Sequence, residues 1–446
     1  MKLPQYVENC INELESAGFV AYAVGGAVRD GLLGLEPSDF DVTTNALPDE
    51  TLAVFSHRRC IPTGIKHGTV TVLFENGEIL SPIEITTFRI DGEYRDSRHP
   101  ESVSFSKNIL DDLSRRDFTV NAMAYNGRDG IIDAHGGMLD LERRLIRAVG
   151  NPEKRFCEDA LRILRAFRFA AQLGFEIEPE TLSAAQKCAP LLQNIARERI
   201  GAEFKKLLSS RGVTYALEKM IERGIFENIF AIQAPDLDKI RGIAALRSDN
   251  PFARLCILLD GATESEFLTF LDGLRLSNDE KKLFLRLMRV KNFAVPSNVD
   301  KTAAPITGTA PTLTRGTPFG APITETTHHG AHLTPAAAHS ASAAHSASAR
   351  RFLHLYGNIL PLATEILLFY NPNATDFLRA IEIESEQKRP LAISDLAVNG
   401  NDLLPFCRGD YKKVGKLLNM LLECVLDNPA LNEKEKLIEI AKKSLE

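Results

Sequence analysis

Cysteine is scarce and scattered in this chain. The seven cysteines are Cys10, Cys60, Cys157, Cys188, Cys256, Cys407 and Cys424. Their odd number, and the absence of any pair two residues apart, argue against a disulfide framework or a zinc knuckle and favour a reducing compartment. No apolar run reaches bilayer-spanning length, and the N-terminus has no signal-peptide core. We therefore expect a cytoplasmic protein without a membrane partner.

A strong charge of one sign is also missing. The formal net charge is −6, which gives no global indication of nucleic-acid binding. A local basic stripe can nevertheless contact phosphates on an acidic protein. The arginines do gather in such local groups: Arg115 and Arg116; Arg162, Arg165 and Arg168; Arg197 and Arg199.

The length of 446 residues is too great for one hydrophobic core, so about two to four domains are expected. Strand and helix patterns alternate over the first 150 residues. We expect strands at 68–74 and 79–88 around a hairpin turn, and helices at 4–17, 49–55 and 110–125. After residue 152 the strand signals vanish, and helical periodicity covers 153–173, 180–192 and 196–209. The chain is thus predicted to be an α+β head with a mixed sheet, followed by all-α domains.

Residues 25–30 read GGAVRD and are the most informative stretch of the chain. The apolar residues before them predict a strand, and residues 28–33 predict a helix. Because Gly25 and Gly26 carry no Cβ, their backbone N–H groups can approach an anion closely. A strand, a glycine turn and a helix N-terminus together predict a phosphate-binding turn.

An Asp-x-Asp pair, Asp39 and Asp41, follows this turn. On a strand, residues two apart point to the same face, so both carboxylates could hold Mg²⁺. A triphosphate-binding turn beside a magnesium pair indicates nucleotidyl transfer. Glu84 lies on a predicted strand that should neighbour the pair. It could activate the attacking hydroxyl or complete the metal ligands, or it could be an ordinary solvent-facing charge.

Two further motifs complete the pattern. Residues 115–122 read RRDFTVNA, and residues 158–169 read EDALRILRAFRF. Arg116 offers paired donors to a triphosphate or ribose. Asp159 and Arg162 would share one helix face, where a plain intrahelical ion pair is the simplest interpretation.

Together these blocks resemble the class II tRNA nucleotidyltransferases, which comprise the CCA-adding enzymes and the bacterial poly(A) polymerases. The resemblance covers roughly residues 20–205 in the right order, and residues 115–122 match the family signature in full. It extends to a Gly-Gly hinge at residues 133–141 and to a neck motif at residues 197–205, for which a salt-bridged structural helix is the favoured role. No appended His-Asp hydrolase module is expected, because the chain contains no His-Asp dipeptide.

The resemblance implies a template made of protein side chains. Asp159 would accept from the exocyclic amine of cytosine or adenine, and Arg162 would donate to the adjacent ring nitrogen. Uracil and guanine reverse both polarities and would be refused. Arg165 and Arg168 would contact phosphate or ribose, or brace Asp159 and Glu158.

The resemblance thus implies template-independent addition of CCA to the tRNA 3′ end from CTP and ATP, with Mg²⁺ as cofactor. Catalysis and metal binding fall to Asp39 and Asp41. The expected nucleotide-binding residues are Gly25, Gly26, Arg29, Arg116, Asp159, Arg162, Arg165 and Arg168. Alternatives are a bacterial poly(A) polymerase, a partial CC- or A-adding enzyme, and a catalytically idle RNA-binding protein. Residues 91–105 look like the full-length flexible loop of complete CCA-adding enzymes, which favours the complete reaction.

The expected domains are a catalytic head at 1–150, a neck at 151–212, a helical body at 213–295 and a tRNA-binding tail at 351–446. Between body and tail, residues 296–350 are dominated by Pro, Thr, Ala, Ser and Gly without hydrophobic periodicity, which predicts a disordered insertion. In the tail, four cations are candidates for contacts to the tRNA backbone, although a merely solvated helix face is at least as good an interpretation. These candidates are Arg408, Lys412, Lys413 and Lys416.

Overall fold

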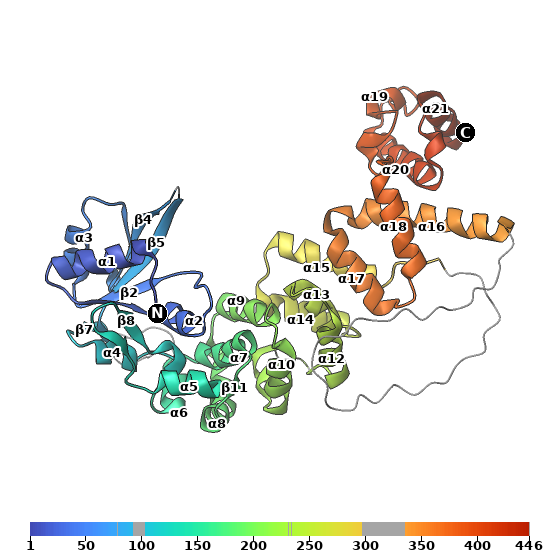
Figure 1. Ribbon diagram of the computed structural model, residues 1–446. Coiled ribbons are helices and arrows are strands. Elements are labelled where there is room, and N and C mark those ends of the chain that lie inside the picture. The colour runs from blue at the N-terminus through green and yellow to red at the C-terminus, as the bar shows by residue number, and fades with distance from the viewer. Residues whose placement is uncertain (78, 92–102, 231, 233, 297–334, 446) are drawn as a thin grey trace. The chain divides into compact units, whose positions relative to one another are not determined.

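The computed structural model describes all residues other than 78, 92–102, 231, 233, 297–334 and 446 (Figure 1). The chain divides into two compact units, Met1–Phe284 and Leu285–Glu446. Their boundary lies inside helix α15 (Asn278–Val290), some residues before the expected end of the body at 295. A mixed sheet with helices forms the N-terminal head, and the remainder is mostly helical, as the sequence predicted.

A seven-stranded sheet organises the head, in the order β3-β4-β5-β2-β1-β8-β9. The strands are β1 (Ala21–Val24), β2 (Asp41–Thr44), β3 (Cys60–Gly64), β4 (Thr69–Asn76), β5 (Ile79–Thr87), β8 (Ala124–Asn126) and β9 (Gly130–Ile132). Only β2 and β5 pair in parallel in this sheet; the other pairs are antiparallel. Along β4, buried and partly exposed residues alternate, so Val70, Val72 and Phe74 enter the core. The predicted hairpin of β4 and β5 is confirmed.

Two small ribbons flank the sheet: β6 (Arg89–Asp91) with β7 (Val103–Phe105), and β10 (Leu145–Ile146) with β11 (Glu176–Ile177). The second ribbon corrects the expectation that no strand follows residue 152. Helices α1 (Gln5–Ser16), α2 (Gly26–Leu32), α3 (Pro48–Val54), α4 (Ile109–Ser114) and α5 (Gly137–Arg143) complete the head. Helix α1 lies against β1 and β4 (Figure 1).

The predicted helix over 110–125 is wrong beyond Ser114. The chain instead turns at residues 115–117, is extended at Phe118, forms a 3₁₀ turn at Thr119–Asn121 and continues into β8. Phe118 is fully buried and bridges to Ala148, while the Asp117 carboxylate accepts from the Phe118 backbone N–H. These tertiary partners outweigh the local helical pattern.

The helical part of the first unit follows the expected sequence. Its helices are α6 (Pro152–Glu158), α7 (Leu161–Leu173), α8 (Pro179–Cys188), α9 (Arg197–Leu208), α10 (Val213–Glu222), α11 (Ile225–Phe230), α12 (Leu237–Ala245), α13 (Pro251–Leu258) and α14 (Glu264–Leu274). A cluster of four phenylalanines forms part of its core: Phe204, Phe226, Phe230 and Phe270. The single helix predicted over 153–173 is interrupted between α6 and α7.

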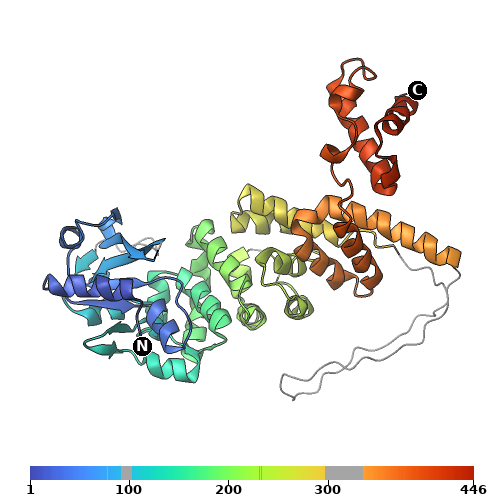
Figure 2. The same cartoon turned by 45° about the horizontal axis from the view of Figure 1, so that its top comes forward.

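The second unit contains α16 (Pro335–Tyr356), α17 (Leu360–Tyr370), α18 (Thr375–Glu386), α19 (Gly400–Leu403), α20 (Tyr411–Asp427) and α21 (Lys434–Leu445). Helix α18 packs beside the long helix α16 (Figure 2). The last three helices enclose a core that includes Leu403, Leu421, Val425 and Leu437.

Part of the predicted disordered insertion is helical. Residues 335–350 form the first turns of α16, whereas residues 297–334 lie outside the described residues. Alanine is the strongest helix former, and this stretch is rich in it. The helix is also anchored by packing, because buried Arg350 donates to Glu384 of α18 at 2.8 Å and to the backbone of α20.

The stretch His345–Tyr370 is long and apolar enough to cross a membrane by length and composition, which differs from the expectation above. It contains the buried Arg350, which forms an ion pair with Glu384 of α18, and it is interrupted by a 3₁₀ turn at Gly357–Ile359. Its apolar residues Phe352, Ile366 and Leu367 are buried within the unit. These contacts tie the stretch to the rest of its unit.

Candidate active site

The glycine turn is built around an arginine. Gly25 follows β1 with φ 71°, ψ −133°, and Gly26 begins α2. A Cβ placed on Gly25 would lie 3.1 Å from Nη1 of Arg116. Glycine is therefore required both for the positive φ and for the approach of this guanidinium. The structure thus places Arg116 against Gly25, next to Gly26.

Arg116 is held on one side only. Its Nη2 donates to Asp112 at 3.1 Å, and Arg115 donates to the same buried carboxylate at 2.6 Å. Burial alone would raise the pKa of Asp112, but Arg116 and Arg115 hold it below its ordinary value. The Nε of Arg116 is buried and has no hydrogen-bond partner among the described residues. An orphaned donor beside a glycine turn is suited to an anionic ligand.

Arg29 was expected to bind the nucleotide directly, but its guanidinium is engaged by other residues of the protein. Its guanidinium is buried, with Nε donating to Asp30 at 2.7 Å and Nη1 donating to Asn121 at 2.7 Å. It also lies 5.2 Å from the centre of the Phe169 ring. Arg29 therefore ties the turn to the segment 115–122.

Asp41 and Glu84 are register partners on the parallel strands β2 and β5. This places Glu84 beside Asp41, as predicted for its strand. Strand β2 begins at Asp41, so Asp39 precedes the strand instead of lying on it, a correction to the expected geometry. The Asp39 carboxylate accepts from Ser38 Oγ at 3.1 Å.

The environment of Asp41 is crowded with negative charge. The side chain remains accessible to solvent, but the surrounding protein displaces much of the nearby water, which is the main cause that raises its pKa to about 6. Glu84 and then Asp39 act in the same direction, and Arg116 opposes them. Mutual repulsion of this kind is relieved by a bound cation.

Among the described residues, no group of three or more His, Cys, Asp or Glu side chains is arranged to enclose a metal. The candidate ligands are the two carboxylates Asp39 and Asp41. Mg²⁺ is typically bound by one or two carboxylates together with substrate phosphates and water, not by an all-protein cage. The donor chemistry therefore fits an oxygen-bound divalent cation that binds with its substrate.

Asp117, which the sequence analysis did not single out, is the centre of a buried network. Its Oδ2 accepts from Nε and Nη2 of Arg165 at 2.9 and 2.7 Å, and its Oδ1 accepts from Asn121 at 3.2 Å. Burial would raise the pKa of Asp117, but Arg165 and Asn121 lower it to about 2. Its place inside the motif at 115–122 was the available sequence signal.

Asp159 and Arg162 do not share one helix face. Asp159 is extended (φ −143°, ψ 103°) between α6 and α7, and Arg162 lies in the first turn of α7. Asp159 accepts from Nη2 of Arg199 at 2.8 Å, so the ion pair forms across elements and not within a helix. Arg162 donates to Glu158 at 2.7 Å and to the backbone oxygens of Arg155 and Arg115.

The remaining two predicted arginines belong to the same network. Arg165 contacts Asp117, and Arg168 donates to Glu203 of α9 at 2.5 Å and lies 3.9 Å from the centre of the Phe169 ring. Neither braces Asp159 or Glu158 by a direct hydrogen bond. Arg168 is buried, and this burial is the main reason why the pKa of its guanidinium is lowered. The neck motif is salt-bridged through Arg199, Glu203 and Lys205, which agrees with the favoured structural role without excluding another.

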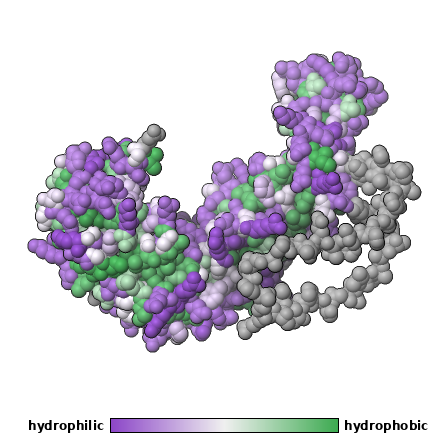
Figure 3. Space-filling model, in the orientation of Figure 1, coloured by the Kyte–Doolittle hydropathy of each residue, from purple (hydrophilic) through white to green (hydrophobic). Residues whose placement is uncertain are grey.

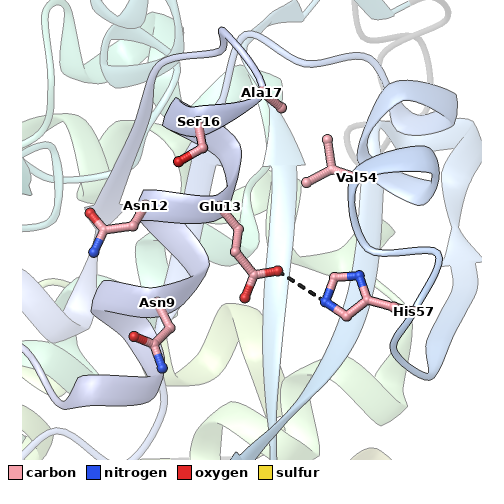
Figure 4. A pocket seen from close by; sticks show the side chains of 7 residues that line it. All are labelled: Asn9, Asn12, Glu13, Ser16, Ala17, Val54 and His57. Atoms are coloured by element: carbon pink, nitrogen blue, oxygen red, sulfur yellow. Dashed lines mark ion pairs between the residues drawn. The ribbon is translucent and has the colours of Figure 1, made fainter.

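The hollow in Figure 4 lies elsewhere on the head. It is lined by residues of α1 and of the region around α3, and Glu13 forms an ion pair with His57 at 3.2 Å. None of the predicted site residues lines it. On the head, apolar side chains gather over the region of α4 and α5, where Leu110, Met138 and Leu139 are exposed (Figure 3). Most of the predicted loop at 91–105 lies outside the described residues.

Comparison with known families agrees with this geometry. Residues 21–147 match the family described as "Poly A polymerase head domain". Residues 174–240 match the family described as "Probable RNA and SrmB- binding site of polymerase A". The first match covers the strands of the head, and the second covers α8 to α11 and the start of α12.

Several curated relatives bear the name CCA-adding enzyme. That of Streptococcus gordonii is 42% identical over 283 residues, which is 63% of this chain and 66% of the relative. That of Geobacillus kaustophilus is 44% identical over 256 residues, which is 56% of this chain and 62% of the relative. The matched region thus spans slightly less than two thirds of these relatives. The enzyme of Enterococcus faecalis is 38% identical, with 65% of this chain matching 70% of the relative.

The fold also matches solved structures. The Bacillus stearothermophilus CCA-adding enzyme in complex with CTP aligns with a TM-score of 0.73 and 29% identity, covering 100% of this chain and 99% of the other. The Thermotoga maritima CCA-adding enzyme complexed with tRNA aligns with a TM-score of 0.62 and 19% identity over 100% and 97%, which supports the fold alone. The chain belongs to the CCA-adding enzyme family, as its sequence motifs indicated.

Proposed function

We propose that this protein adds CCA to the 3′ end of tRNA from CTP and ATP without a nucleic-acid template. The observation that carries the proposal is the placement of Asp41 beside Glu84, with Arg116 reaching the glycine turn at Gly25. Carboxylates next to a cationic anion site are what nucleotidyl transfer from a triphosphate requires. Names of relatives and titles of solved neighbours support the substrates.

In this proposal the turn at Gly25 and Gly26 holds the triphosphate, with Arg116 supplying its unpartnered Nε. Arg29 supports the turn from beneath through Asp30 and Asn121. The tRNA 3′-hydroxyl attacks the α-phosphate in line, and pyrophosphate leaves. Fixing both reactants removes the entropic cost of bringing them together.

A divalent cation is assigned to Asp39 and Asp41, and we propose Mg²⁺. When bound, such an ion lowers the pKa of the attacking hydroxyl and stabilises the pyrophosphate leaving group. The chain contributes the hard carboxylate oxygens and, through Arg116, a positive charge that favours the ionised form of Asp41. Glu84 supports the same locus from the adjacent strand.

Base selection is assigned to Asp159 and Arg162. Arg199 fixes the Asp159 carboxylate, and Leu161 N–H donates to it at 3.1 Å, which leaves acceptor capacity for an exocyclic amine. Arg162 would donate to the ring nitrogen of cytosine or adenine. Uracil or guanine would leave these groups unpaired, at a cost of about 1–3 kcal/mol for each group.

Arg165 and Arg168 receive a positioning role, because Asp117 and Glu203 occupy their guanidinium groups. Arg165 remains partly accessible and is retained as a candidate for a ribose or phosphate contact. Binding of the tRNA backbone is assigned to the tail. Its exposed cations Arg408, Lys412, Lys413 and Lys416 stand on α20 or just before it.

The test is extension of a tRNA transcript that lacks its last three nucleotides, with Mg²⁺ and CTP, ATP or both. We expect growth by two nucleotides with CTP alone, growth by three with both, and then a halt. Long adenosine tails with ATP alone would move the assignment to a poly(A) polymerase. Arrest after two additions with both nucleotides would identify a partial CC-adding enzyme. A cytoplasmic location belongs to the proposal, since tRNA and nucleotides meet there.

A further inference from the structure

Two cysteines lie against each other where α6 and α8 pack. Cys157 is in α6 and exposed, whereas Cys188 is the last residue of α8 and buried. The two thiols lie close enough to interact electrostatically. The two helices are in extensive contact. The pair thus joins one accessible thiol to one protected thiol across a helix–helix interface.

An ion pair also links α6 and α8 beside the two cysteines. Nζ of Lys187, the neighbour of Cys188, lies 2.6 Å from Oε2 of Glu153. Glu153 stands four residues before Cys157 and therefore on the same face of α6. The Lys187 ammonium is within electrostatic range of both thiols. At Cys188 the Glu153 carboxylate raises the pKa more than the Lys187 ammonium lowers it. The thiolate is the reactive form of cysteine.

We propose that Cys157 and Cys188 form an oxidation site at which a peroxide converts the two thiols into an α6–α8 disulfide. In the first step the Cys157 thiolate attacks the peroxide O–O bond, giving a sulfenic acid and, with hydrogen peroxide, water. In the second step the Cys188 sulfur displaces that hydroxyl as water, and the S–S bond forms. The peroxide accepts the two electrons that the thiols lose.

The order of steps follows from burial. Cys157 is open to a solvent oxidant, while Cys188 is shielded. Burial, and then the neighbouring Cys157, raise the pKa of Cys188 to about 11, so this thiol reacts poorly by itself. It is nevertheless already adjacent to the sulfur that is oxidised first. In a reducing compartment the disulfide would be reopened by cellular thiols, as is usual for redox-sensing pairs.

The location gives the disulfide a consequence for the active site. Cys157 is two residues before Asp159, and α6 ends at Glu158. A bond to α8 would fix the end of α6 and restrict the segment that carries Asp159. This consequence rests on the proposed function; we expect slower nucleotide addition after oxidation and recovery with dithiothreitol. The disulfide itself does not depend on that function.

The test begins with the full chain, treated with hydrogen peroxide, denatured and alkylated. We expect two fewer alkylated cysteines than the seven of the reduced chain. Trypsin should release residues 156–162 and 188–197 as one linked species that dithiothreitol separates. Cys157→Ser should abolish the link, and Cys424→Ser, a half-buried cysteine in α20, should retain it. Cys157 is exposed, so its substitution should not impair folding, which a thermal melt would verify.

The proposal is overturned if Cys157 proceeds to sulfinic or sulfonic acid while Cys188 remains alkylatable. It is equally overturned if peroxide treatment of Cys157→Ser still removes two alkylatable cysteines. Nucleotide addition is not measured in these arms, so failure of the disulfide and failure of the proposed function remain distinguishable. A linked chain with unchanged extension would limit the inference to the modification site.

Discussion

The guanidinium of Arg199 in α9 donates to the carboxylate of Asp159 at 2.8 Å, joining the neck motif to the break between α6 and α7. Both side chains are largely buried. The pair therefore fixes the residue to which we assign recognition of the exocyclic amine. Without Arg199, Asp159 would lose the partner that orients its carboxylate.

Arg199→Ala should accordingly weaken selection of CTP and ATP against UTP and GTP. We expect a loss of discrimination of about tenfold to a hundredfold, corresponding to one or two misplaced hydrogen bonds. Measurement of kcat/KM for each nucleotide would show it. Arg241→Ala, which removes an exposed ion-paired arginine of α12, is the matched control and should leave the ratios unchanged. Equal loss for all four nucleotides would assign Arg199 a purely structural role.

Asp41→Asn should abolish nucleotide addition by about 10³-fold or more, since each lost factor of ten corresponds to about 1.4 kcal/mol of transition-state stabilisation. CTP binding should persist, because the glycine turn and Arg116 are intact. Single-turnover extension and equilibrium CTP binding separate the two effects. Asp49→Asn, at an exposed position in the first turn of α3, serves as control. Retention of activity in Asp41→Asn would remove this residue from catalysis.

Acid stability should depend on Asp117. The pKa of Asp117 is about 2 in the folded chain against an ordinary value of 3.8, so the folded state binds the proton less readily. The charged form therefore contributes stability that is fully present above about pH 4 and is lost as the pH falls towards 2. The expected contribution is about 2 kcal/mol.

Asp117→Asn should therefore lower the free energy of unfolding at pH 7, and the difference from the parent chain should narrow as the pH approaches 2. Urea unfolding across this range measures it. Asp238→Asn, with a 90% exposed side chain, should behave like the parent chain throughout. A difference that stays constant with pH would show that the Asp117–Arg165 charge interaction is not its source.

The limits of sequence reasoning are visible in this same network. The strands, the hairpin and the glycine turn could be predicted because they rest on local patterns: alternation, turn residues and missing Cβ atoms. The end of the helix predicted over 110–125 could not be placed at Ser114 from the sequence. It depends on the bridge between Phe118 and Ala148, which are far apart in the chain. Asp159 pairs with Arg199, forty residues away, and not with its helical neighbour, a choice that only tertiary packing makes.

Gly137→Ala should destabilise the head. A Cβ at this position would lie 2.3 Å from the backbone oxygen of Thr119, which cannot move independently of the segment 115–122. We expect a loss of about 2 kcal/mol or more, as for other overpacked sites. Gly127→Ala is the control, because its Cβ would meet nothing within 4 Å. Equal thermal midpoints for the two variants would contradict the steric account.

The tail cations should act through phosphate. A double change, Lys412→Glu with Lys413→Glu, should raise the KM for tRNA and reduce its salt dependence without altering CTP binding. Both side chains are exposed in the first turn of α20, whose N-cap is Asp410. Lys282→Glu, at an exposed position in α15, is the control. An unchanged KM for tRNA would show that these lysines form a solvated helix face and do not contact the tRNA.

The most direct test of the account is nucleotide choice on a tRNA lacking its last three nucleotides, in an equal mixture of CTP, ATP, UTP and GTP. Sequencing of the product 3′ ends should show CCA and nothing longer for the parent chain. Asp159→Ala should admit uridine or guanosine. Uridine or guanosine in the parent products at levels comparable to cytidine, or runs of adenosine, would contradict the proposed side-chain template.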